Sequence, residues 1–154
     1  MDGLNLLKED HKKVTELFKK VEATDEEAKH QLLFEKIKTE LETHTFIEEK
    51  VLYPMLEQYE ALKDLVLEAY EEHKQVKTLI REIEKLAEGS ERFDAKLKVM
   101  GENVEHHVDE EENQMFPKVR KVLGNQQLER LGKDLEAAKK EFNQSGKGQS
   151  AGKR

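Results

Sequence analysis

Histidine and glutamate recur at the same spacing in two stretches of this 154-residue chain. HTFIEEKVLYP covers residues 44–54, and HVDEEENQMFP covers residues 107–117. Each stretch begins with a histidine, has a pair of carboxylates starting four residues later, and ends in an aromatic residue and a proline. Imidazole nitrogens and carboxylate oxygens bind zinc, iron and manganese in proteins. The shared spacing therefore raises the possibility of a metal site that is encoded twice.

The elements that carry these residues have a helical pattern. Apolar residues recur every three or four positions, which is the spacing of one face of an α-helix. Four such stripes cover residues 4–21, 33–55, 62–83 and 93–115. Long amphipathic helices with short connections predict an all-α fold, an antiparallel up-down-up-down four-helix bundle. A fifth, shorter helix is expected at about residues 125–142.

A single histidine interrupts each apolar stripe: His11, His44, His73 and His107. Glu48 and Glu111 follow two of these histidines by four residues, which is about 40° around a helix, so they face inward as well. Two carboxylates in a bundle core cost roughly several kcal/mol each unless a partner compensates them. Lys77 is the one cation near that depth, and its long stem could carry the charge to water. A pair of metal ions compensates the carboxylates better.

The four histidines also form an internal repeat. His11 and His44 are 33 residues apart, and His73 and His107 are 34 apart. Antiparallel stacking of the two hairpins would bring four imidazoles and two carboxylates to one level. If both carboxylates bridge, the set supplies about eight of the roughly twelve positions of two octahedral ions, which leaves room for solvent and an exogenous ligand. Such an open nitrogen and oxygen site favours iron or manganese over structural zinc.

This arrangement resembles the hemerythrin-like (HHE cation-binding) domain over about residues 4–120. The resemblance implies a four-helix bundle around two iron ions (Fe2+/Fe3+) with a solvent-derived oxo or hydroxo bridge. The metal ligands that it implies are His11, His44, Glu48, His73, His107 and Glu111. It also implies dioxygen, hydrogen peroxide or nitric oxide as the small ligand. The ferritin-like alternative uses Glu-x-x-His, the reverse of the order found here.

One position departs from the oxygen-carrying members of that family. They have a second histidine four residues after the first on the third helix, where this chain has Lys77. One iron would lack an imidazole, so we expect redox chemistry with peroxide, oxygen or nitric oxide, of a catalase-like or stress-defence kind, rather than oxygen carriage. Some hemerythrin-like proteins are similar in having a tyrosine beside the metals. Tyr53 is thus a candidate additional ligand if Pro54 bends the helix, whereas its counterpart Phe116 cannot ligate.

Two other function classes stay open: an oxygen- or iron-sensing module without turnover, and a structural bundle without metal. Residues near the site have simpler interpretations. We expect His30 and His106 at the surface. Glu49 and Glu112 lie about 140° around the helix from their histidines, so we expect them to be solvated helix-face charges.

The composition restricts the kinds of molecule that the protein can bind. A net charge of −7 argues against nucleic acid and anionic membranes, and the absence of cysteine excludes disulfides and thiolate metal sites. No apolar run is long enough to span a membrane, and there is no secretory signal at the N-terminus, so we expect a cytoplasmic protein, as a monomer or weak dimer. We expect one domain over residues 1–142, with a disordered tail over 143–154.

Overall fold

The computed structural model describes residues 1–86 and 90–146, and within these ranges it contains helices and no strand. The α-helices are α1 (Gly3–Glu22), α2 (Glu27–Ile47), α3 (Tyr53–Leu56), α4 (Glu60–Glu84), α5 (Glu91–Glu110), α6 (Phe116–Val122) and α7 (Asn125–Glu141). Three π-helical turns are η1 (Glu48–Leu52), η2 (Glu111–Met115) and η3 (Phe142–Gly146). The predicted all-α bundle with an additional C-terminal helix is confirmed. Gly89, near the predicted end of the third stripe, and the part of the predicted tail from residue 147 on lie outside the described residues.

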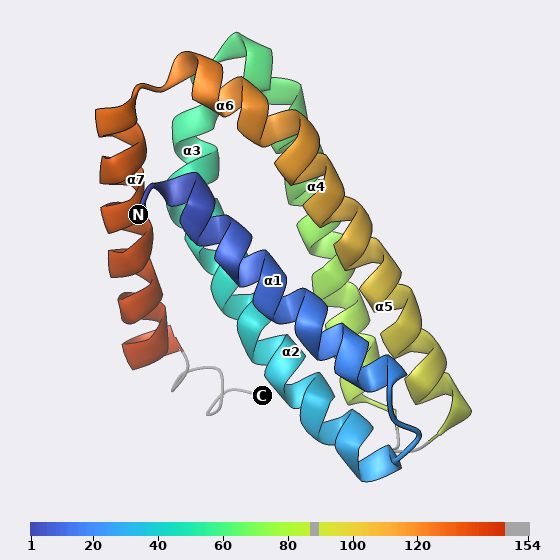
Figure 1. Cartoon of the computed structure of the whole chain (residues 1–154). Helices are drawn as coiled ribbons and strands as arrows, with labels where there is room; N and C mark the ends of the chain where they lie inside the picture. The colour runs from blue at the N-terminus through green and yellow to red at the C-terminus, as the bar shows by residue number, and fades with distance from the viewer. Residues whose placement is uncertain (87–89, 147–154) are drawn as a thin grey trace.

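The bundle consists of two helical hairpins, one of α1 with α2 and one of α4 with α5 (Figure 1). Side-chain caps fix the starts of α1 and α5: Asp2 accepts the backbone N–H of Asn5 at 2.9 Å, and Ser90 accepts that of Phe93 at 3.0 Å. These caps satisfy backbone N–H groups of the first turn and fix where each helix begins.

The core has two apolar clusters with a polar level between them. One cluster contains Leu7, Ile47 and Ala69, and the other contains Val14, Leu41 and Val76. On α1, α2 and α4 the stripe histidine lies between these two sets of residues in the chain. The polar level is therefore sealed by apolar side chains above and below.

Both repeated stretches contain a π turn directly after the helix that carries the histidine. The N–H of Tyr53 donates to the carbonyl of Glu48, and the N–H of Phe116 donates to that of Glu111. Each π turn precedes a proline, which has no N–H for an α-helical bond. The wider π turn inserts one residue, so Tyr53 comes back to the face of Glu48 instead of lying about 140° away. The bend expected at Pro54 is thus a π turn that occurs in both halves.

The last helix, α7, packs along α1 and α2 (Figure 1). Glycines permit the close approach, because a Cβ atom on Gly132 would lie 2.3 Å from the carbonyl oxygen of Met1. Farther along α7, Lys139 Nζ reaches Asp10 Oδ1 at 2.8 Å. In the described ranges, each helix is too short or too polar to traverse a lipid bilayer.

Candidate metal centre

The six predicted ligands meet at the polar level in the middle of the bundle. All six are buried, and Glu48 has no exposed surface. They come from α1, α2, α4 and α5 and from the first residues of η1 and η2. Their inward atoms form two groups with the spacing of metal ligands, which we call half-site 1 and half-site 2.

Half-site 1 consists of His11 Nε2, His44 Nε2, Glu48 Oε2 and Glu111 Oε1, which all lie within 4.8 Å of one another. His11 Nε2 is 3.0 Å from Glu111 Oε1, and His44 Nε2 is 3.2 Å from Glu48 Oε2. Two nitrogens from one hairpin thus face one oxygen from each carboxylate.

Half-site 2 uses the other oxygen of each carboxylate. His73 Nε2 is 3.1 Å from Glu48 Oε1, and His107 Nε2 is 3.5 Å from Glu111 Oε2. Glu48 and Glu111 therefore each face both half-sites, as the donor count made from the sequence assumed. In half-site 1 two imidazole nitrogens and two carboxylate oxygens have the spacing of metal ligands, whereas in half-site 2 two imidazole nitrogens and the oxygen of Glu48 have it and Glu111 Oε2 lies beside His107.

Four further carboxylates surround the histidines and contact their outer nitrogens. The Nδ1 atoms of His11, His44, His73 and His107 lie 2.6, 3.3, 2.7 and 2.5 Å from Glu112, Asp10, Glu49 and Glu72, respectively. An Nδ1–H that donates to a carboxylate fixes the ring orientation and leaves Nε2 as the nitrogen that can bind a metal. All four rings are therefore held with Nε2 directed into the bundle.

These outer carboxylates correct the sequence-based prediction. Glu49 and Glu112 were expected to be solvated charges, but their side chains are only 27% and 30% exposed and each holds a histidine of another helix. Asp10 and Glu72 were not considered at all. The repeat contained a signal for them, because an acidic residue directly precedes His11 and His73 and a second glutamate directly follows Glu48 and Glu111.

Five buried ligand atoms have no hydrogen-bond partner in the described part of the chain. They are His11 Nε2, His44 Nε2, His107 Nε2, Glu48 Oε2 and Glu111 Oε1. Their closest contacts have ion-pair distances but are not directed as hydrogen bonds. A buried polar group left in this state costs about 1–3 kcal/mol. Five of them converging on one level fit a cation-binding centre and are hard to reconcile with a purely structural core.

The carboxylates and histidines of this level shift one another's pKa. Burial opposes a charged imidazole, but Glu48 and Asp10 outweigh it and raise the pKa of His44 to about 10. Burial also opposes ionisation of Glu111, yet His107 and His11 hold its pKa well below the usual value. Glu111 is therefore ionised at neutral pH, and a metal must displace a proton from His44.

Tyr53 lies inside the centre, as its candidate role requires. Its side chain is fully buried, and its hydroxyl donates to Glu48 Oε1 at 3.0 Å and to Glu111 Oε2 at 2.8 Å. The same oxygen is 3.2 Å from His73 Nε2. Burial and the charges of the two glutamates raise the pKa of Tyr53 well above its usual value. All three contacts are with atoms of half-site 2.

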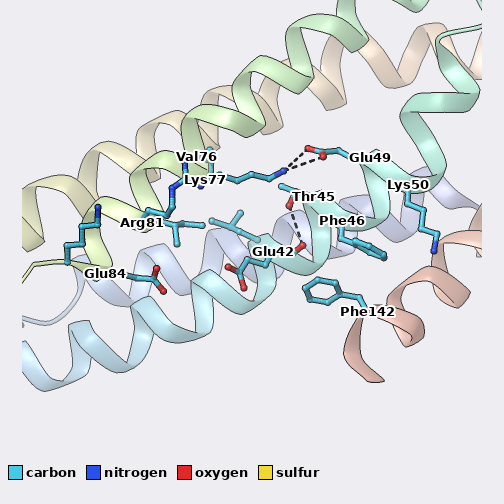
Figure 2. A pocket seen from close by; sticks show the side chains of 13 residues that line it. Glu42, Thr45, Phe46, Glu49, Lys50, Val76, Lys77, Arg81, Glu84 and Phe142 are labelled. Carbon is cyan, nitrogen blue, oxygen red and sulfur yellow. Dashed lines mark hydrogen bonds and ion pairs between the residues drawn. The ribbon is translucent and has the colours of Figure 1, made fainter. Parts of the chain in front are cut away.

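Three neighbours of the centre have other surroundings. His106 is exposed, with 67% of its side chain accessible, as predicted. His30 was predicted at the surface, which is wrong, because it is buried at the end of the bundle where α1 joins α2. Lys77 points to Glu49, with Nζ 3.3 Å from both of its oxygens (Figure 2).

A small apolar cavity of about 20 Å³ adjoins the histidines. Its wall includes all four stripe histidines together with Val14, Leu41, Val76, Val104 and Val108. A space of this size holds about one water-sized molecule. The centre can therefore admit a very small ligand from this side, but no organic substrate.

Comparison with known proteins points to one family. Residues 2–119 match the family model of the hemerythrin HHE cation-binding domain. A solved structure of a hemerythrin HHE cation-binding domain-containing protein from Mycobacterium kansasii superposes with a TM-score of 0.84 and is 26% identical, covering 99% of this chain and 94% of that one.

Two curated relatives are also similar. A DNA nickase from Nostoc is 29% identical over 152 residues, and an uncharacterised hemerythrin-like protein from Schizosaccharomyces pombe is 29% identical over 103 residues. The matches cover 99% and 66% of this chain, but only 43% and 51% of those relatives.

Proposed function

Because the chain belongs to the hemerythrin HHE cation-binding domain family, we propose that it is a non-haem di-iron protein that reacts with peroxide, dioxygen or nitric oxide. The observation that carries this proposal is the set of five buried ligand atoms without hydrogen-bond partners in the described residues. They are arranged around two carboxylates that each face both half-sites. Such a centre suits two ions held side by side.

The donor set supports iron. Both half-sites offer imidazole nitrogens and carboxylate oxygens, and the chain has no cysteine to supply a thiolate. Imidazole with carboxylate suits iron and manganese, while closed tetrahedral sites are typical of structural zinc. Bound iron would supply redox chemistry and Lewis acidity. Manganese or zinc are less suited alternatives.

The surroundings restrict the ligand to a small molecule. The cavity beside the histidines has room for about one water-sized molecule, and the aliphatic side chains in its wall limit the entry of bulk water. On the other side of the centre, the hydroxyl of Tyr53 is the proton-bearing group in contact with both bridging carboxylates. The wall of the cavity can therefore shield a very small ligand, while Tyr53 holds one proton at the two carboxylates across the centre.

The test combines metal analysis with spectroscopy and turnover. Protein expressed with iron should contain two iron ions per chain, and its optical spectrum should change when peroxide is added. Oxygen evolution from peroxide, or consumption of nitric oxide, would identify the reaction. Binding of two ions should also raise the free energy of unfolding by about 4 kcal/mol or more when the metal is in thousandfold excess over its Kd. Less than one iron per chain and a melting temperature unaffected by chelation would establish a structural bundle instead.

A sensing role is the second candidate, because one contact joins the centre to the C-terminal helix. Lys139 of α7 pairs with Asp10, and the other oxygen of Asp10 lies 3.3 Å from His44 Nδ1. A change at half-site 1 could therefore alter how α7 packs against α1 and α2. This role predicts an iron- or oxygen-dependent change in protease cleavage at α7 without turnover. Cleavage that is the same with and without iron would exclude it.

A further inference from the structure

The two half-sites have the same donor types but differ in how many donor atoms are already satisfied. In half-site 1 all four donor atoms are without a hydrogen-bond partner among the described residues. In half-site 2 this holds only for His107 Nε2. The other three donor atoms of half-site 2, on His73, Glu48 and Glu111, all contact the hydroxyl of Tyr53.

The hydroxyl of Tyr53 competes directly with a cation for half-site 2. It lies 2.8 Å from Glu111 Oε2 and 3.0 Å from Glu48 Oε1, so its single proton serves both oxygens. Hydrogen bonds to ionised carboxylates are about twice as strong as neutral ones. A cation entering half-site 2 must break them, whereas a cation entering half-site 1 breaks no such bond.

Tyr53 cannot easily leave its place. Its ring is fully buried and packs edge-on against Tyr70, with ring centres 5.2 Å apart. The η1 turn fixes the backbone, since the N–H of Tyr53 is bonded to the carbonyl of Glu48. The hydroxyl is therefore a permanent feature of half-site 2.

Half-site 1 has no equivalent group among the described residues. The η2 turn brings Phe116 to the corresponding place, where its ring stacks on His11 with ring centres 6.2 Å apart and an angle of 9°. A phenyl ring can neither donate to the carboxylates nor bind a cation through oxygen. The two π turns thus place a hydroxyl at half-site 2 and a phenyl ring at half-site 1.

We infer that Tyr53 makes the two half-sites fill in order, with half-site 1 binding the first divalent cation and half-site 2 the second. This inference rests on the proposed metal-binding function, but not on any reaction of the loaded centre. The second ion binds more weakly because it must break the hydrogen bonds from the Tyr53 hydroxyl to the two carboxylates and because it joins a centre that already carries a cation. Tyr53 therefore controls loading.

The experiment is an oxygen-free calorimetric titration of the metal-stripped full chain with Fe2+. Wild type should show two steps, with the second about tenfold or more weaker than the first, in line with the loss of a charge-assisted hydrogen bond. Tyr53→Phe should tighten the second step and leave the first unchanged. Tyr70→Phe, which removes a hydroxyl from the neighbouring ring, is the matched control and should leave both steps as in wild type.

Two half-site variants assign the steps. His107→Ala should keep the tight step and lose the weak one, while His11→Ala should lose the tight step. The inference is overturned if His11→Ala keeps the tight step, or if Tyr53→Phe leaves the ratio of the two affinities unchanged. It is also overturned if Tyr53→Phe weakens the second step, because the hydroxyl would then assist binding. A wild-type chain that binds no Fe2+ would refute the proposed function itself, which is a different result.

Discussion

His30 and the four histidines of the metal centre are alike in burial and in having an acidic partner at Nδ1, but their second nitrogen meets different surroundings. His30 Nδ1 is 2.9 Å from Asp94, and its Nε2 is 3.1 Å from the carbonyl of Val21 and 2.6 Å from that of Thr24. Both of its nitrogens are therefore satisfied. In the centre, Nε2 of His11, His44 and His107 has no hydrogen-bond partner among the described residues.

The pKa shifts of the two regions have the same direction but a different consequence. Burial disfavours the charged form of His30, but the hydrogen bond to Asp94 and the carbonyl of Thr24 outweigh it and raise its pKa. The protons of His30 are held by Asp94 and by backbone carbonyls, which are not part of the metal centre. In the centre the pKa of His44 is raised by carboxylates. A metal ion bound at these carboxylates can replace the proton of His44. Burial and an acidic neighbour thus do not identify a metal ligand, whereas a second nitrogen that faces a central carboxylate instead of backbone carbonyls does.

The strongest test of this contrast removes a bridging carboxylate. Glu111→Ala should lose nearly all iron, because Glu111 supplies one oxygen to each half-site. His106→Ala, one residue before a ligand but exposed, should keep the wild-type iron content, as should His30→Gln. Iron per chain, measured by elemental analysis after identical loading, gives the comparison. Equal loss in Glu111→Ala and His106→Ala would mean that the assignment of inward and outward faces is wrong.

A smaller effect is expected when an outer carboxylate is changed. Glu112→Gln keeps the size of the side chain but weakens its hold on His11 Nδ1, now at 2.6 Å. Metal affinity should fall about 10- to 100-fold, as is typical when the outer partner of a ligating histidine is removed. A competition titration with a chelator measures the change, and the exposed Glu102→Gln on α5 is the control. Unchanged affinity in Glu112→Gln would show that packing alone orients the ring.

The sequence allowed the fold and the inner ligands to be predicted because both depend on periodicity. The apolar stripes defined the bundle, and the phase of Glu48 and Glu111 placed them inward. Glu49 and Glu112 were misjudged because an ideal α-helix turns them away from the histidine of their own helix, whereas their partners are histidines of other helices. Contacts between helices depend on how the hairpins stack, which single-helix geometry does not contain.

Tyr53 and His30 show two further limits. The position of Tyr53 depends on a π turn, which no apolar period reveals, although the proline after it in both repeats was a usable sign. His30 was judged by its distance from the site level and by its polar type. Its burial depends on backbone carbonyls of the turn between α1 and α2, to which no side-chain pattern points.

Replacing His30 tests the structural side of the comparison. His30→Gln should lower the free energy of unfolding by about 1–3 kcal/mol, since two carbonyls lose their donor, and should leave metal content unchanged. Its pKa is raised in the folded chain, so its charge-dependent contribution is complete below about pH 6.5 and is lost as the pH rises through the folded value. Denaturant unfolding at pH 5.5 and 9 should show a larger difference from wild type at the lower pH. A difference that grows with pH would contradict a protonated His30.

The smallest effect is expected at Lys77, which lies at the edge of a groove of about 790 Å³ lined by residues of α2, η1, α4 and η3 (Figure 2). Its side chain is 44% exposed, and it pairs with Glu49, which in turn holds His73 Nδ1 at 2.7 Å. Lys77→Gln should change stability by less than about 1 kcal/mol, because a half-exposed ion pair contributes little. Metal affinity should stay near wild type, while Glu49→Gln should weaken it in the way expected for Glu112→Gln. If Lys77→Gln weakens the metal as much as Glu49→Gln does, the lysine rather than the carboxylate alone positions His73, and the outer contacts of the centre extend to the surface of the bundle.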